Sequence, residues 1–144
     1  MTAIAIKCIE DLEARVEQIT VLKGRVFHVY SEEELVERTK GLSFPCVGIV
    51  YDGMMAIPEQ KPTTKVGGSA ELVATVMVFF RQDTKAKNDP KDQTVALLDQ
   101  IRGKILATRS PSQHLWRFKL EAAVEGKQGL LTYVQRWATP VQLV

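Results

Sequence analysis

The chain has 144 residues, of which 45% are hydrophobic and 25% are charged, so it is expected to form one globular domain and not a disordered or fibrous protein. Its 19 basic and 17 acidic residues leave a formal charge of +2, which excludes a broad basic field for holding a polyanion. No stretch approaches the roughly 20 apolar residues of a membrane helix, and the N-terminus lacks the layout of a signal peptide.

The chain is predicted to begin with a helix, a strand and a second helix. Apolar residues recur at steps of three and four over 5–19, with acidic residues between them, which indicates an amphipathic helix. The β-branched and aromatic segment 25–30 predicts a strand. Ser31 and Glu34 then have the spacing of a capping box, so a second helix is expected to begin there and to run to residue 40.

A buried strand and a long polar connection are expected next. The apolar run 44–51 predicts the strand, with Pro45 at its beginning or on an edge because proline cannot donate to a ladder. Asp52-Gly53 is typical of a turn that closes it. Residues 54–69 contain two prolines, two glycines, Lys61 and Lys65, which favours an extended loop or a long hairpin arm.

The strongest strand signal covers 70–81, and this strand is expected at the centre of the sheet. A polar connection over 82–89 follows, and Asp89-Pro90 begins a long helix. The apolar stripe of this helix is expected to contain Val95, Leu97, Leu98, Ile101, Ile105 and Leu106, until Ser110-Pro111 ends the element.

Two alternating segments close the chain. Trp116, Phe118 and Leu120 alternate with charged residues, which predicts a strand with one buried side, and 131–137 forms its hairpin partner. The tail 140–144 is apolar and requires cover from its own domain or from a neighbouring subunit. The predicted fold class is therefore α+β, a mainly antiparallel β-sheet packed against two to three α-helices in the order α-β-α-β-β-α-β-β.

A search for chemistry yields no catalytic, cofactor or metal site. His28 and His114 are the only groups that titrate near neutral pH, and neither has a partner in a recognised catalytic spacing. Gly67-Gly68-Ser69 precedes a strand and not a helix, so it does not predict a phosphate loop. Cys8 and Cys46 have neither zinc nor redox spacing and are interpreted as free core thiols of a reducing compartment. The chain is therefore predicted not to be an enzyme.

Two basic stretches leave a second interpretation open. Arg81, Lys85, Lys87 and Lys91 form the first, and Arg102, Lys104 and Arg109 form the second. These side chains would suit DNA passing through a ring. Because acidic residues interleave with the first stretch, a solvated surface is the preferred explanation.

Several short pieces of the sequence resemble a protein family of Mu-like bacteriophages and prophages. These pieces are Arg109-Ser110-Pro111, His114-Leu115-Trp116-Arg117-Phe118, Tyr133-Val134-Gln135-Arg136-Trp137-Ala138-Thr139-Pro140, and Phe44-Pro45-Cys46-Val47 with Tyr51-Asp52-Gly53. Members are taken to be tail terminator or tail-completion proteins that join tail to head. The resemblance implies a structural virion protein of the tail or neck, assembled in the host bacterial cytoplasm, that caps the tail tube as a hexameric ring. It brings no catalytic residues.

The implied partners are further copies of the chain, the tail tube protein, the head-tail connector or neck protein and, as a further candidate, the sheath protein. DNA would be met only as it passes through the lumen, and no membrane is involved. A ring needs heterologous contacts between copies. We expect these contacts at 54–69, 82–89 and the tail, through Lys61, Lys65, Arg81, Lys85, Lys87, Pro140, Val141, Leu143 and Val144. The alternative is a small nucleic-acid-binding or adaptor module encoded by a phage or prophage.

Overall fold

The structure is a computed structural model that describes residues 3–41, 43–57, 68–81, 90–124 and 130–143. Its elements in chain order are α1 (Ile4–Glu17), the short 3-10 helix η1 (Thr20–Leu22), β1 (Val26–Val29), α2 (Glu32–Thr39), β2 (Cys46–Ala56), β3 (Ser69–Arg81), α3 (Pro90–Ile105), β4 (Arg117–Val124) and β5 (Leu130–Gln142). The predicted α+β class and the predicted order of helices and strands are confirmed.

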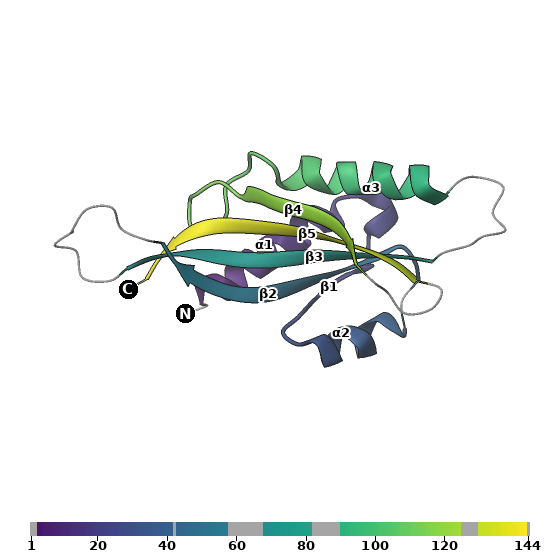
Figure 1. Cartoon of the computed structure of the whole chain (residues 1–144), viewed down its shortest axis with the longest axis horizontal. Coiled ribbons are helices and arrows are strands. Elements are labelled where there is room, and N and C mark those ends of the chain that lie inside the picture. Colours follow the sequence, from purple (N-terminus) through teal and green to yellow (C-terminus); the bar gives the residue numbers. More distant parts are fainter. Residues whose placement is uncertain (1–2, 42, 58–67, 82–89, 125–129, 144) are drawn as a thin grey trace.

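The five strands form one sheet in the order β1-β2-β3-β5-β4, as Figure 1 shows. The β1–β2 pair is parallel and the other three pairs are antiparallel. The strand β3 lies in the middle, as predicted from its continuous apolar sequence. The strands β1 and β4 are the two edges, so each has one described neighbour.

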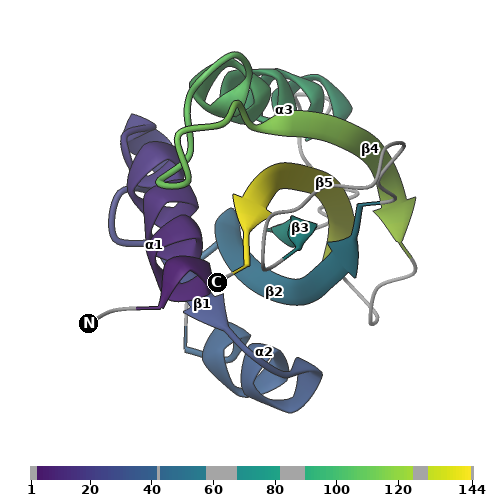
Figure 2. The same ribbon diagram turned by 90° about the vertical axis from the view of Figure 1, so that its left-hand side faces the viewer.

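The helices cover the two faces of the sheet unequally. The helices α1 and α3 pack on one face, where the main core contains Leu12 and Val16 of α1 and Leu98, Ile101 and Ile105 of α3. Figure 2 shows α2 on the opposite side of the sheet from α3. There it closes a smaller core against Phe27, Val29, Cys46 and Phe79 through Leu35.

Two local signals of the sequence act as predicted. The side chain of Ser31 accepts a hydrogen bond from the Glu34 amide and caps α2, while Glu34 Oε2 accepts from the amide of Tyr30. Pro45 immediately precedes β2, where the missing amide costs no ladder bond.

The expected turn at Asp52-Gly53 is wrong. The strand β2 continues through both residues to Ala56, and the register against β3 shifts between Tyr51 and Gly53. Asp52 is therefore the extra residue of a β-bulge, and Gly53 adopts a φ of 111° that a glycine tolerates without strain. A turn did not form because β3 is long enough to pair with β2 on both sides of the bulge.

The hairpin alternative for 54–69 is confirmed up to Ala56, which pairs with Ala70 at the start of β3. Residues 58–67, which include Lys61 and Lys65, lie outside the described residues. The connection 82–89 with Lys85 and Lys87 also lies outside them.

The predicted burial is wrong in two elements. Val95 is 58% exposed, because the buried stripe of α3 runs through Thr94, Leu98, Ile101 and Ile105 and turns Val95 away from the sheet. Leu106 follows the last residue of α3 and is 55% exposed. All eight residues of β4 are exposed, although one side of this strand was expected to be buried. The strand is an edge, and a bulge between Phe118 and Leu120 interrupts its alternation.

Candidate assembly interface

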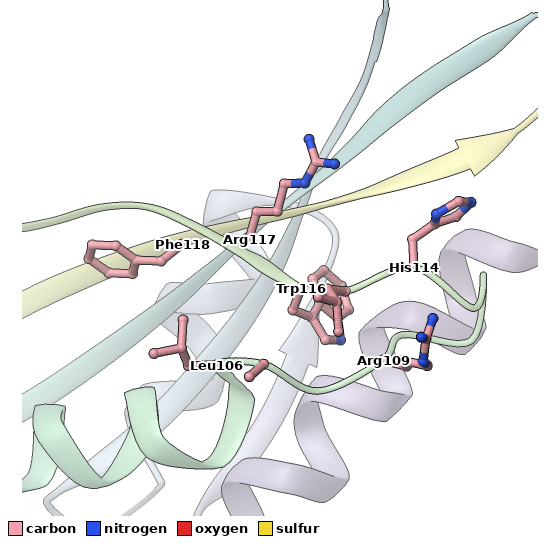
Figure 3. Close-up of a pocket in the computed structure, with 8 residues that line it drawn as sticks. Leu106, Arg109, His114, Trp116, Arg117 and Phe118 are labelled. Carbon is pink, nitrogen blue, oxygen red and sulfur yellow. The ribbon is translucent and has the colours of Figure 1, made fainter.

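A groove lies beside the edge strand β4, where the segment after α3 approaches the start of that strand. It has a volume of about 560 Å³ and is lined by Leu106, Ala107, Arg109, His114, Leu115, Trp116, Arg117 and Phe118. We call this surface the β4 groove. Figure 3 shows Trp116 in the middle of these side chains, with the guanidinium of Arg117 pointing away from it.

Large apolar side chains in the β4 groove remain exposed. Leu106, Leu115 and Phe118 are 55%, 47% and 41% exposed, whereas Trp116 beneath them is 2% exposed. Phe118 packs edge-to-face on Trp137, with ring centroids 5.4 Å apart, and so keeps a fixed position. Apolar groups gathered in this way are typical of a surface that another molecule covers.

The segment that forms the groove is fixed to α1 by a set of hydrogen bonds. Trp116 Nε1 donates to Asp11 Oδ2 at 3.0 Å, and Arg15 Nε donates to the same oxygen at 2.9 Å. Arg15 Nη2 also donates to the carbonyl oxygen of Arg109 at 2.9 Å. The groove is therefore attached to a helix that lies about 100 residues earlier in the chain.

Bonds within the segment hold its shape. The amide of Ser110 donates to the His114 carbonyl at 2.8 Å, and the amide of Trp116 donates to the Thr108 carbonyl at 2.9 Å. The hydroxyls of Ser110 and Thr139 lie 2.8 Å apart and join the segment to β5. These bonds make a preformed surface, which lowers the entropic cost of binding a partner.

Two residues of the same segment adopt the left-handed region of φ. Ala107 has a φ of 60° and Gln113 a φ of 72°. Residues other than glycine enter this region at an energetic cost, and such conformations persist where the surrounding structure holds them. The observed strain marks the segment as a specific shape and not an unconstrained connection.

Two basic side chains, Arg109 and Arg117, line the β4 groove, and no acidic side chain of the described residues does. Arg109 Nη1 donates to the Gln113 carbonyl at 2.7 Å, so part of its charge supports the loop. The side chains of Arg117 and His114 are exposed and have no polar partner among the described residues. The groove therefore presents apolar surface next to an unneutralised positive charge.

The edge strand β4 continues the same surface. Within the described part of the chain it pairs only with β5, so one side of its backbone is free for further pairing. The bulged residue Lys119 forms an ion pair with Glu71 of β3 at 3.0 Å. Bulges and lysines on an edge strand disfavour non-specific pairing with other strands. A partner that binds β4 therefore has to be complementary to its side chains.

The predicted interface residues that the structure describes lie elsewhere. Arg81 is at the end of β3, with its guanidinium 5.6 Å from the centre of the Phe44 ring. Val141 is 2% exposed and belongs to the core of its own chain, and Pro140 is half-buried in β5. Leu143 is 41% exposed. Lys61, Lys65, Lys85, Lys87 and Val144 lie outside the described residues.

The two histidines are not brought into one site by any described contact. His28 Nδ1 lies 2.5 Å from Glu13 Oε2 and so joins β1 to α1. His114 lies in the β4 groove, where its carbonyl supports the loop. Among residues 3–41, 43–57, 68–81, 90–124 and 130–143, no three His, Cys, Asp or Glu side chains gather to hold a metal ion. No described helix is long and apolar enough to span a membrane.

The second basic stretch is partly neutralised by acidic neighbours. Arg102 pairs with Asp99 at 3.0 Å and with Glu121 of β4. Burial opposes the charge of Arg102, but the hydrogen bonds to Glu121 and Asp99 raise its pKa above the ordinary value. This arginine therefore joins α3 to β4 and is not a free contact for a polyanion.

The exposed residues Leu106, Leu115 and Phe118 were missed as a site. The sequence pattern assigned Leu106 and Phe118 to the core, because a period of two or of 3.6 does not reveal whether a strand is an edge or where a helix ends. The absence of acidic residues over 100–120 was the available signal. No family model and no curated protein matches this chain.

Proposed function

We propose that the chain is a structural assembly protein of a bacteriophage tail, which binds neighbouring subunits through the β4 groove and the β4 edge. The observation that carries the proposal is an exposed apolar groove with two basic side chains, on a hydrogen-bonded segment at a sheet edge that has no further strand among the described residues. Such a surface recognises protein by shape, apolar contact and charge.

The place of the groove supports the tail role. The pieces Arg109-Ser110-Pro111 and His114 to Phe118, on which the resemblance to the Mu-like tail proteins depends, contribute six of the eight groove residues. Within that role the protein would cap the tail tube and join it to the head connector, in the tail or neck of the virion, as a hexameric ring. We further infer that it acts by binding and makes or breaks no covalent bond.

The exposed apolar side chains of the groove can supply part of the energy of a specific contact. Burying a large apolar side chain completely is worth about 1.5–3 kcal/mol, so covering the exposed half of each groove side chain would yield about 1 kcal/mol. Association has a large entropic cost, and the rigid groove lowers it. The apolar groups therefore contribute affinity, and the charges contribute orientation and choice of partner.

Deletion of the gene in the phage or prophage that encodes it tests the proposal. We expect particles with unjoined heads and tails of irregular length, seen by electron microscopy, and restoration by the wild-type gene. Complementation by Leu115→Ser should fail, whereas Val21→Ser, at an equally exposed position outside the groove, should restore joining. Normal tail length and head joining in the deletion strain would contradict the proposal.

Binding of nucleic acid is the competing proposal, and the five basic residues of 100–120 favour it. Of these residues, Arg102 and Lys119 already have acidic partners, and Arg109 bonds to its own loop. Duplex DNA that binds the purified protein with a steep salt dependence would support this alternative. Weak binding that differs little from that of Arg117→Glu would count against it.

A further inference from the structure

The opposite edge of the sheet carries the opposite charge. Residues 31–40 contain four glutamates, one arginine and one lysine. Here β1 passes into α2, and Tyr30, Glu33, Glu34 and Glu37 are exposed; we call these four residues the acidic corner. Arg38 and Lys40 are also exposed, and Lys40 pairs with Glu37 at 3.0 Å, so Glu33 is the carboxylate of the corner for which no ion pair or hydrogen bond is found among the described residues. The ring of Tyr30 is 51% exposed, so a large aromatic side chain lies next to the carboxylates.

Contacts of α2 with the sheet and within its first turn hold the acidic corner in place. Leu35 fixes α2 to the smaller core, and the Ser31 cap with its Glu34 partner fixes the first turn. The approach of α2 to the sheet is close at Gly48. A Cβ atom added to Gly48 would lie 2.7 Å from Leu35 Cδ1 and 3.0 Å from the Phe27 ring, so a larger residue there would have to displace one of these side chains.

The two surfaces cannot meet within one molecule. The strands β1 and β4 are the two edges of a five-stranded sheet, and Figure 2 shows α2 beside β1 at the bottom of the view, with α3 and β4 at the top. Each surface is complementary to the other, because one offers an aromatic ring with carboxylates and the other offers apolar side chains with a free guanidinium. Contact between different patches on successive copies is a heterologous interface.

We propose that the β4 groove of one copy receives the acidic corner of a second copy, in a head-to-tail contact. Tyr30 supplies the apolar anchor for Leu106, Leu115 and Phe118, and the carboxylate of Glu33 faces the guanidinium of Arg117. Tyrosine and arginine are the residue types that dominate the binding energy of protein interfaces. This inference rests on the proposed function, because it names the partner of the same groove.

Charge-reversal variants of the full chain test the contact. The variants are R117E, E33K and the double R117E/E33K, and the measurement is the dissociation constant of self-association, by sedimentation velocity over a concentration series. The matched controls are K7E and E10K, which make the same changes of charge at exposed positions of α1 that belong to neither surface. Circular dichroism verifies that every variant is folded.

We expect wild-type self-association that weakens with salt, and each of R117E and E33K should raise the dissociation constant about tenfold or more. The double variant should recover most of the lost affinity, because the charges are complementary again. The controls should match wild type. A wild-type monomer at every concentration, or a double variant as weak as the product of the single effects, would overturn the inference.

These outcomes are separable from the test of the proposed function. If the double variant restores self-association but the protein is absent from purified tails, the contact between Arg117 and Glu33 is supported and the tail role is overturned. If the protein is required for tail completion but R117E and E33K do not compensate each other in self-association, only the head-to-tail contact is overturned. If the wild-type protein stays monomeric and binds duplex DNA, and R117E abolishes that binding, the groove binds nucleic acid and the inference fails.

Discussion

The bond between Asp11 and Trp116 should decide whether the β4 groove keeps its shape. In Asp11→Ala, the indole Nε1 of Trp116, a residue that is 2% exposed, loses the acceptor that lies 3.0 Å away. A buried donor without a partner costs about 1–3 kcal/mol. The ion pair with Arg15, whose side chains are 25% and 23% exposed, adds about 0–1 kcal/mol. We therefore expect the free energy of unfolding to fall by about 1–4 kcal/mol.

Urea unfolding measures this loss, as a lower midpoint with an unchanged slope. Asp11→Asn is the matched control, because its amide oxygen still accepts from the indole while the charge is lost, and we expect a cost of about 1 kcal/mol. In a Trp116→Phe background, which has no indole donor, Asp11→Ala should cost much less than in wild type. The reasoning is refuted if Asp11→Ala changes stability by less than about 0.5 kcal/mol, or if Asp11→Asn is equally costly.

Further substitutions test other parts of the structure. Gln135→Leu should lower the free energy of unfolding by about 2 kcal/mol in urea titrations, because the buried Trp137 Nε1 loses its acceptor at 3.2 Å. Burial raises the thiol pKa values of Cys8 and Cys46 from 9.0 to about 11, so stability should fall as pH rises from 9 to 11, and replacing both by alanine should remove that loss. Native thiols should also react slowly with a thiol reagent at neutral pH, and fast labelling would contradict their burial. Leu115→Ser should change stability by no more than about 0.5 kcal/mol, since the side chain is 47% exposed, while self-association weakens.

Local sequence was sufficient to predict the order of the elements. Ser31 caps α2, Pro45 precedes β2, and the apolar run ending at Arg81 forms the central strand β3. These outcomes depend on neighbouring residues, through a cap, a missing amide or the side-chain preferences of a strand. For that reason they could be predicted without the tertiary structure.

The candidate site depended on contacts that no local pattern encodes. Asp52-Gly53 became a bulge because β3 pairs on both sides of it, and β4 is exposed because no strand of the described residues lies beyond it. The β4 groove exists because Trp116 is bonded to Asp11, 105 positions away in the chain. The sequence by itself therefore determined which elements form, since their signals are short-range, and the tertiary structure decided which apolar side chains stay exposed, since burial depends on what packs against them.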